Sequence, residues 1–198
     1  MKCVVMLGVY DTFQEECDYL VGVDRGAFFL AQQHLKMDLA IGDFDSVTAR
    51  EFLFIQEHAT EIILMPKEKD FSDSEYALMK LNEMDFDEII IYGGLGKRWD
   101  HSYLNLRLLE KYPQAVLKDD YNEISMIETG IYTIEKKDFR YLSLMPICEG
   151  MITIQGVKYP LSKRKISAKD TYLVSNEILD DYAQISLEGR ALLFLSRD

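Results

Sequence analysis

The first 120 residues alternate short apolar runs with amphipathic segments at helical spacing, and this alternation constrains the fold more than any other feature of the sequence. The apolar runs predict strands at 3–8, 19–23, 39–41, 61–65, 88–92 and 115–117. The segments between them predict helices at 27–35, 48–58, 72–83 and 100–110. Strands that alternate with helices form a mostly parallel sheet with right-handed crossovers. We therefore predict an α/β domain over residues 1–120.

The pattern changes near Asp119 and Asp120, where helical spacing gives way to short period-two runs separated by turn residues such as Gly130 and Gly150. These runs predict strands at 131–134, 141–144, 151–154, 172–174, 183–187 and 191–195. They are typical of an antiparallel sandwich or barrel, so we predict a smaller C-terminal all-β sandwich over residues 121–198. A β-domain of that size buries a modest core. We expect it to rest on its neighbour or on a second chain.

Composition excludes some classes of function. The net charge of −12 argues against general nucleic-acid binding, which needs a basic surface. Three widely spaced cysteines form no metal-site or disulfide pattern and favour a reducing compartment, so we predict a cytoplasmic protein. The apolar run near the N-terminus is too short to span a membrane, and we expect no membrane association.

Acidic residues follow several of the predicted strands. Because parallel strands end at one edge of a sheet, these side chains are expected to lie along that edge, where open α/β sheets bind ligands. Carboxylates held close together repel each other unless a cation lies between them, and oxygen ligands suit Mg²⁺. Each acid alone has an ordinary alternative, as a surface turn or a helix start. Together they predict a metal site formed from Asp24, Asp43, Asp45, Asp70, Asp73 and Asp100.

A glycine-rich loop at 93–98 supplies the opposite charge through Lys97 and Arg98. The loop leaves a predicted strand and enters a predicted helix, so its amides and the helix dipole favour an anion. It lacks the ending of a P-loop and the third glycine of a dinucleotide-binding motif. A flexible turn with a solvated basic pair is the alternative interpretation. Acids that hold Mg²⁺ beside a basic glycine loop indicate phosphoryl or nucleotidyl transfer.

Several segments, in the same order, resemble motifs of the thiamine pyrophosphokinase family. In the α/β part they are VDRGA at 23–27, IGDFDS at 41–46, KDFSDSE at 69–75 and GGLGKRWDH at 93–101. In the β part, GVKYPL at 156–161 and VSNE at 174–177 are similar to the family's thiamine-side segments. The resemblance covers nearly the whole chain. It implies transfer of a pyrophosphoryl group from ATP to the hydroxyl of thiamine, with Mg²⁺, by a homodimer with active sites between subunits.

The resemblance also implies roles for individual residues. Asp43, Asp45 and Asp73 would hold Mg²⁺ with Asp70 beside them, and Asp100 would orient the thiamine hydroxyl or the metal shell. The nucleotide phosphates would be held by Lys97, by Arg98 and by the backbone of the turn formed by Asp24, Arg25 and Gly26. Thiamine would be bound by Ser175 and Asn176, which hydrogen-bond the aminopyrimidine, and by Tyr159 or Leu161, which pack on a ring.

The chain departs from the family motifs at Arg25 and Lys97, which each replace a glycine. Arg25 would contact a phosphate or point to solvent. Two other functions are considered beside the main one. In an aspartyl-nucleophile phosphatase, Asp43 would attack phosphorus and Asp45 would act as acid and base. A thiamine- or nucleotide-binding regulator with a decayed site is the non-catalytic alternative.

Overall fold

The computed structural model describes residues 1–10, 13–66, 68, 70–96 and 98–197. The chain divides into two compact units, Met1–Asp119 and Asp120–Asp198, which are described separately. Within the described residues, no helix is long and apolar enough to cross a membrane.

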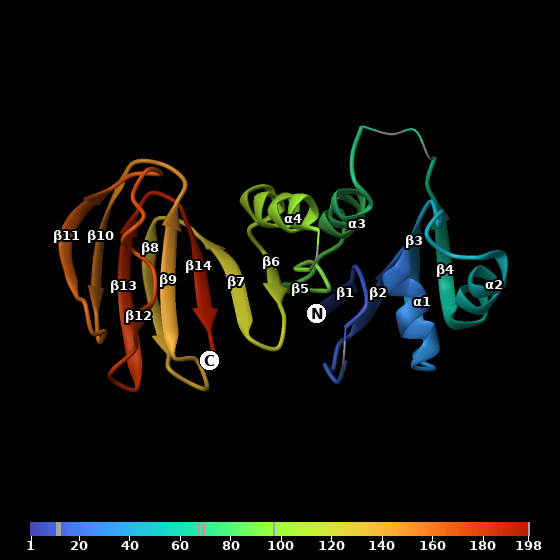
Figure 1. The fold of residues 1–198 in the computed structure, drawn as a ribbon, viewed down its shortest axis with the longest axis horizontal. Helices are drawn as coiled ribbons and strands as arrows, with labels where there is room; N and C mark the ends of the chain where they lie inside the picture. The colour runs from blue at the N-terminus through green and yellow to red at the C-terminus, as the bar shows by residue number, and fades with distance from the viewer. Residues whose placement is uncertain (11–12, 67, 69, 97, 198) are drawn as a thin grey trace. The chain divides into compact units, whose positions relative to one another are not determined.

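The first unit is built on a sheet of parallel strands (Figure 1). The strands lie in the order β6-β5-β1-β2-β3-β4. The parallel sheet and its helices confirm the predicted α/β fold. The strands are β1 (Lys2–Met6), β2 (Tyr19–Val23), β3 (Met37–Gly42), β4 (Ala59–Leu64), β5 (Glu88–Tyr92) and β6 (Ala115–Lys118).

Within the described residues, helices connect each pair of successive strands except β1 and β2. They are α1 (Arg25–Gln32), α2 (Ala49–His58), α3 (Asp73–Asn82) and α4 (Trp99–Lys111), close to the predicted ranges. Their starts follow from local chemistry. Thr48 and Glu51 form a complete capping box at α2, and Ser72 Oγ accepts a hydrogen bond from the Glu75 amide at α3.

The order of the strands places a crevice near the middle of this sheet. From β1 the chain proceeds outward through β2 and β3 to β4, and then returns to β5 on the other side of β1. Connections on the two sides of such a reversal diverge, so the carboxyl ends of β1 and β5 border a natural ligand-binding crevice.

The inner strands β1, β2, β3 and β5 are buried on both faces, as is usual in parallel sheets, whereas the edge strand β4 is partly exposed. On one face, Met6 and Ala40 pack with Leu30 of α1 and Ile55 of α2 in a single apolar cluster. Side chains that point to the other face of the sheet, such as Ile91, are also buried. Lys111 Nζ of α4 lies 2.7 Å from Glu75 Oε1 of α3, and this ion pair links the two helices.

The second unit is an antiparallel β-sandwich, which confirms the predicted fold class for this part of the chain (Figure 1). One sheet has the order β12-β9-β14-β7 and the other has the order β11-β10-β13-β8. Alternating side chains from both sheets, including Leu144, Ile154 and Leu193, form one core. The strands are β7 (Asn122–Ile127), β8 (Gly130–Glu135), β9 (Tyr141–Pro146), β10 (Gly150–Gln155), β11 (Leu161–Ile166), β12 (Asn176–Glu177), β13 (Tyr182–Glu188) and β14 (Ala191–Ser196).

The strand predictions for this unit need three corrections. The predicted strand at 172–174 is wrong, because this segment is irregular and pairing begins only at Asn176. β7 and β11 were not predicted. β11 is the edge strand of its sheet. It is mostly exposed and carries Lys163, Arg164 and Lys165. Charged edge strands of this kind discourage pairing with other chains, and they lack the apolar alternation that marks a buried strand.

Candidate active site

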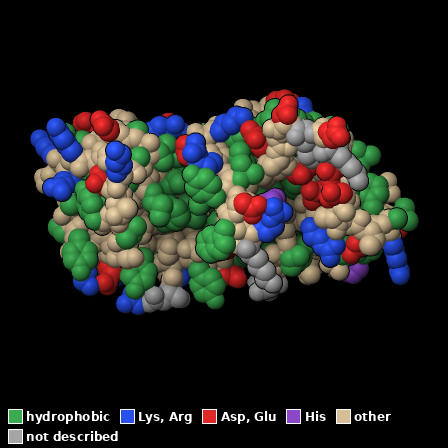
Figure 2. All heavy atoms as spheres, turned by 45° about the horizontal axis from the view of Figure 1, so that its top comes forward, with side chains coloured by type: hydrophobic (Ala, Val, Ile, Leu, Met, Phe, Trp, Pro, Cys, Tyr) green, Lys and Arg blue, Asp and Glu red, His purple; other side chains and the backbone are tan. Residues whose placement is uncertain are grey.

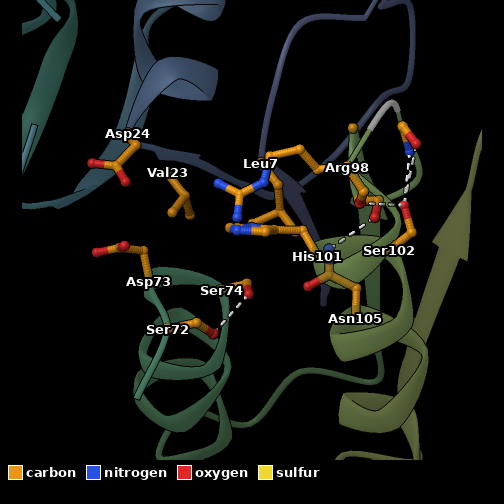
Figure 3. Close-up of a pocket in the computed structure, with 13 residues that line it drawn as sticks. Leu7, Val23, Asp24, Ser72, Asp73, Ser74, Arg98, His101, Ser102 and Asn105 are labelled. Carbon is orange, nitrogen blue, oxygen red and sulfur yellow. Dashed lines mark hydrogen bonds between the residues drawn. The ribbon is translucent and has the colours of Figure 1, made fainter. Parts of the chain in front are cut away.

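A pocket of about 340 Å³ lies at the carboxyl edge of the parallel sheet (Figure 3). It lies at the point where the strand order reverses, because Leu7 follows β1 while Gly93 and Gly94 follow β5. The start of α3 and the first turns of α4 complete the walls. The lining residues are Leu7, Val23, Asp24, Ser72, Asp73, Ser74, Gly93, Gly94, Gly96, Arg98, His101, Ser102 and Asn105.

The pocket has an acidic side and a basic side. Figure 3 shows Asp24 and Asp73 on one side, and the Arg98 and His101 side chains on the side of α4. Asp24 follows β2 and Asp73 begins α3, so the fold brings these carboxylates to one pocket from distant parts of the sequence. On the surface, acidic side chains cluster on the same face as basic and histidine side chains (Figure 2).

Asp24 shapes the neighbouring acidic turn that follows β3. Its Oδ1 accepts a hydrogen bond from the Phe44 amide at 3.0 Å, and its own amide donates to the Ile41 carbonyl at 2.9 Å. A Cβ atom on Gly42 would lie only 2.0 Å from Asp24 Oδ1, so any other residue there would displace the Asp24 carboxylate. Asp24 itself has φ 47°, a left-handed conformation that costs energy in a non-glycine residue. The site thus contains local strain that tertiary contacts maintain.

The acidic turn is held together by its own side chains and by α1. The Asp45 amide donates to Asp43 Oδ1 at 3.1 Å. Arg25 Nη1 donates to the Ser46 carbonyl at 3.2 Å and lies 3.4 Å from Glu51 Oε1. Arg25 therefore contacts the acidic turn and does not line the pocket.

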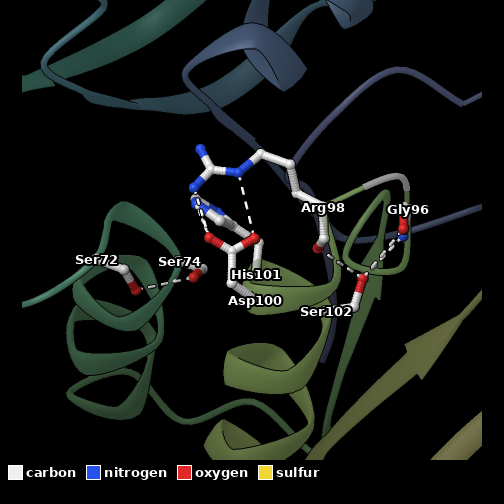
Figure 4. Close-up of polar contacts among 7 residues, drawn as sticks. All are labelled: Ser72, Ser74, Gly96, Arg98, Asp100, His101 and Ser102. Carbon is white, nitrogen blue, oxygen red and sulfur yellow. Dashed lines mark hydrogen bonds and ion pairs between the residues drawn. The ribbon is translucent and has the colours of Figure 1, made fainter.

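Two polar side chains of α4, Ser102 and Asn105, hold the glycine loop, and Figure 4 shows the contact between Ser102 and Gly96. Asn105 Nδ2 donates to the Gly94 carbonyl at 2.8 Å, and the Gly96 amide donates to Ser102 Oγ at 3.0 Å. The Ser102 hydroxyl lies 3.2 Å from the Arg98 carbonyl, to which it donates. Asn105 and Ser102 are both buried, so these hydrogen bonds are protected from water. Helix α4 thereby fixes the shape of the loop.

Arg98 and Asp100 form an ion pair at the mouth of the pocket (Figure 4). Arg98 Nη2 and Nε donate to the two Asp100 oxygens at 2.6 and 3.3 Å. The hydrogen bond from Arg98 lowers the pKa of Asp100, and the same contact raises the pKa of Arg98. Both groups are charged at neutral pH. His101 Nε2 lies 4.0 Å from Asp100 Oδ2, within reach of the same carboxylate.

The structure brings some of the predicted site residues together and leaves others outside the pocket. Asp24, Asp73 and Arg98 line the pocket, whereas Asp43 lines an adjacent hollow with Phe44 and Phe52. The remaining predicted residues do not line it: Asp45 and Asp70 are exposed, Asp100 pairs with Arg98, and Gly26 is buried against the Met6 carbonyl. The prediction for Lys97 lies outside the described residues.

The donor atoms at this edge suit a hard cation. Among the described residues, no group of three His, Cys, Asp or Glu side chains is close enough to hold a metal ion. Asp24 and Asp73 in the pocket, with Asp43 at the end of the next strand, offer only carboxylate oxygens. Oxygen donors of this kind match Mg²⁺ rather than a metal that prefers nitrogen or sulfur ligands.

A second, smaller pocket of about 80 Å³ lies in the β-sandwich unit. Tyr159, Leu161 and Asn176, three of the residues predicted to bind thiamine, line it together with Tyr172. The Asn176 amide group bonds the backbone of Tyr159, accepting from its N–H and donating to its carbonyl, both at 3.0 Å. Ser175 has φ 56° and its amide donates to Ser143 Oγ at 2.8 Å. Asn176 thus holds Tyr159 at this pocket.

Sequence reasoning missed Ser72, Ser74, His101, Ser102 and Asn105, all of which line the first pocket. A signal for two of them was present. Ser102 and Asn105 lie three residues apart on the face of α4 that also carries Leu108 and Leu109. Polar residues at core positions of an amphipathic helix indicate a buried hydrogen-bonding role.

Comparison with known proteins identifies the family. Residues 10–119 match the model of the thiamin pyrophosphokinase catalytic domain, and residues 131–192 match that of the thiamin pyrophosphokinase vitamin B1 binding domain. Thiamine pyrophosphokinase of Bacillus subtilis (strain 168) is 33% identical over 190 residues, which cover 92% of this chain and 89% of that protein.

Solved structures agree with the sequence match. The crystal structure of thiamine pyrophosphokinase from Bacillus subtilis has a TM-score of 0.91 and 31% identity, with both chains covered completely. A thiamin pyrophosphokinase family protein from Enterococcus faecalis has a TM-score of 0.88 and 30% identity over 100% of this chain and 99% of that chain. The chain therefore belongs to the thiamin pyrophosphokinase family.

Proposed function

We propose that this protein transfers the diphosphoryl group of ATP to the hydroxyl of thiamine, giving thiamine diphosphate and AMP. The observation that carries the proposal is the pocket at the strand-order reversal, which has carboxylates on one side and Arg98 on the other, in a chain of this family. In the reaction the thiamine hydroxyl oxygen attacks the β-phosphorus of ATP. The bond from that phosphorus to the α-phosphate oxygen breaks, and AMP leaves.

The acidic residues are proposed to hold Mg²⁺ with the nucleotide. Asp43, Asp45 and Asp73 would be the ligands, with Asp70 beside them, because all four follow β3 or β4 at the carboxyl edge of the sheet. A bound Mg²⁺ would offset the negative charge on the phosphate oxygens. Asp24 supports this set by holding the Phe44 amide and hence the turn that carries Asp43 and Asp45.

Arg98 is proposed to bind the phosphate oxygens, since its side chain lines the pocket. Asp100 binds the edge of the guanidinium that carries Nε and Nη2 and fixes its orientation. The other N–H groups remain for a ligand. We also propose phosphate contacts from Lys97 and from the backbone of the turn at Asp24, Arg25 and Gly26. Positioning and electrostatic stabilisation of this kind are the main contributions a protein makes to phosphoryl transfer.

Thiamine is proposed to bind through the β-sandwich residues. Tyr159 and Leu161 line the small pocket there and offer an apolar surface to a ring. Asn176 keeps Tyr159 in place, and Ser175 and Asn176 would hydrogen-bond the aminopyrimidine. A homodimer and a cytoplasmic location are further parts of the proposal; the family resemblance supports the first and the isolated free cysteines support the second.

A product assay separates this function from the two alternatives. Incubation with ATP, Mg²⁺ and thiamine is expected to give AMP and thiamine diphosphate in equal amounts. An aspartyl-nucleophile phosphatase would instead release inorganic phosphate and leave a phosphoryl group on Asp43, which mass spectrometry detects. A non-catalytic regulator would bind thiamine or nucleotide and form no AMP, and that outcome with folded protein would contradict the proposal.

A further inference from the structure

The inner wall of the pocket carries a buried polar group that the proposed function does not use. Asn105 is only 6% exposed, and its Nδ2 donates to the Gly94 carbonyl at 2.8 Å. That hydrogen bond determines which end of the amide is nitrogen, so Oδ1 is the other end. Figure 3 shows the Asn105 side chain between the glycine loop and the start of α3. Among the described residues, Asn105 Oδ1 has no hydrogen-bond partner.

An unpaired buried acceptor is unfavourable in a folded protein. Leaving such a group without a partner costs about 1–3 kcal/mol, and native structures seldom retain one without a reason. The neighbouring hydroxyl of Ser102 does not supply the missing donor, because it is directed to the backbone of Arg98 and Gly96. A donor from a bound ligand would satisfy Asn105 Oδ1.

The chemistry of that ligand group is restricted. An amide oxygen accepts hydrogen bonds and donates none. Ionised phosphate oxygens are also acceptors, so a phosphate would be disfavoured against Asn105 Oδ1. The matching group is an O–H or N–H donor. The pocket of the proposed nucleotide site would receive such groups from the ribose hydroxyls or the base amino group of the nucleotide.

We propose that Asn105 is a specificity-determining residue, whose Oδ1 accepts a hydrogen bond from a ribose hydroxyl or the base amino group of the nucleotide. Through Nδ2 the same side chain holds the glycine loop at Gly94. One amide thus connects the loop to the neutral part of the ligand. The inference rests on the proposed function only in taking ATP as the nucleotide. It concerns binding and can be measured without turnover.

Calorimetric binding of ATP analogues tests this inference. The protein and its Asn105→Ala variant are titrated with ATP, 2′-deoxy-ATP, 3′-deoxy-ATP and purine riboside triphosphate, which lacks the base amino group. We expect one analogue to bind the unmodified protein about tenfold more weakly than ATP does, and Asn105→Ala to bind that analogue and ATP equally. This loss of discrimination follows because removal of either partner breaks the same hydrogen bond. Asn82→Ala, which changes an exposed asparagine paired with Gln114, is the matched control and should keep the discrimination.

Several outcomes would overturn the inference. One is binding of all four nucleotides by the unmodified protein within a factor of two. Another is unchanged discrimination in Asn105→Ala, which would assign Asn105 to loop support alone. If Asn105→Ala does not fold by circular dichroism, Asn105→Ser provides the same comparison with a shorter side chain. Weaker thiamine binding with unchanged nucleotide discrimination would assign the oxygen to the thiamine hydroxyl instead. Failure to form AMP would refute the proposed reaction without affecting these binding comparisons.

Discussion

Asp73 is the acidic residue whose placement best supports the proposed metal role. It lies at the first turn of α3 and lines the pocket with Asp24. We predict that Asp73→Asn lowers kcat by about 10²-fold or more, because a metal ligand acts on charge that develops in the transition state. Steady-state rates of AMP formation measure this effect. Asp85→Asn removes an exposed acid outside the pocket and should change kcat less than twofold; equal effects of the two substitutions would contradict the role.

The two arginines near the site, Arg25 and Arg98, have different surroundings. Arg98 lines the pocket, whereas Arg25 contacts Ser46 and Glu51 beside the acidic turn. We predict that Arg98→Ala raises the KM for ATP about tenfold or more, since it removes a phosphate contact. Arg25→Ala should raise that KM by less than threefold. Initial rates at varied ATP concentration measure both values, and a larger effect of Arg25→Ala would show that Arg25 binds a phosphate directly.

Gly42 shows how closely the backbone approaches the side chain of Asp24. A Cβ atom there would lie 2.0 Å from Asp24 Oδ1, whereas a Cβ atom on Gly96 would meet nothing within 4 Å. We predict that Gly42→Ala lowers the free energy of unfolding by about 1–3 kcal/mol through overpacking. Gly96→Ala is the steric control and should lower it by far less. Urea denaturation measures both, and similar values for the two variants would contradict the close contact.

Two of the predicted acids, Asp24 and Asp73, line the pocket, but the sequence did not reveal the contacts that support them. Acidic residues after strands are visible in the chain, because each follows an apolar run. The contacts that orient them are not visible, since Asp24 reaches Phe44 across 20 residues and Asn105 reaches back to Gly94. Such partners are determined by tertiary structure. The local spacing of Asp100 and Arg98 likewise did not indicate that the two would pair.

Among the elements of the first unit, the connection between β1 and β2 is anchored by a carboxylate. Glu15 in this connection accepts hydrogen bonds from Lys2 Nζ at 2.5 Å, from Lys118 Nζ at 3.2 Å and from the Tyr92 hydroxyl. These partners belong to β1, β6 and β5. Burial alone would raise the pKa of Glu15, but hydrogen bonds from Lys2, Tyr92 and Lys118 outweigh it and lower the pKa to about 2.

The lowered pKa predicts a pH dependence of stability. A depressed carboxyl pKa contributes stability above the ordinary value near 4.5, and the contribution is lost as the pH falls from about 5 to 2. We predict that Glu15→Gln lowers the free energy of unfolding by about 2 kcal/mol at pH 7 and that the difference shrinks over this range. Denaturation at several pH values measures it, and the exposed neighbour supplies the control Glu16→Gln. A difference that does not change with pH would contradict the ion network.

Helices and buried strands were predictable because their signals are local. Thr48 and Ser72 cap α2 and α3 as their sequences indicate, and β2 and β5 have the predicted bounds. Polar strands such as β11 were missed because one side of that strand has no neighbour in its sheet. The segment 172–174 has strand-like composition, yet its residues line the small pocket instead of pairing.

Across the whole molecule, the architecture follows from the two sequence patterns described first. The α/β unit supplies a pocket at the reversal of its strand order, and the sandwich unit supplies a small apolar pocket. We propose that the first pocket binds ATP and that the second binds thiamine. In the proposed reaction, both terminal phosphates of ATP move together to thiamine.

Position-specific labelling follows the two phosphates through the reaction. The protein is incubated with Mg²⁺, thiamine and ATP labelled with ³²P at the β-phosphate, and the products are separated by chromatography. Transfer of a diphosphoryl group predicts that the label appears in thiamine diphosphate and that AMP is unlabelled. Label found in ADP, with thiamine carrying only phosphate from the γ-position, would contradict the account.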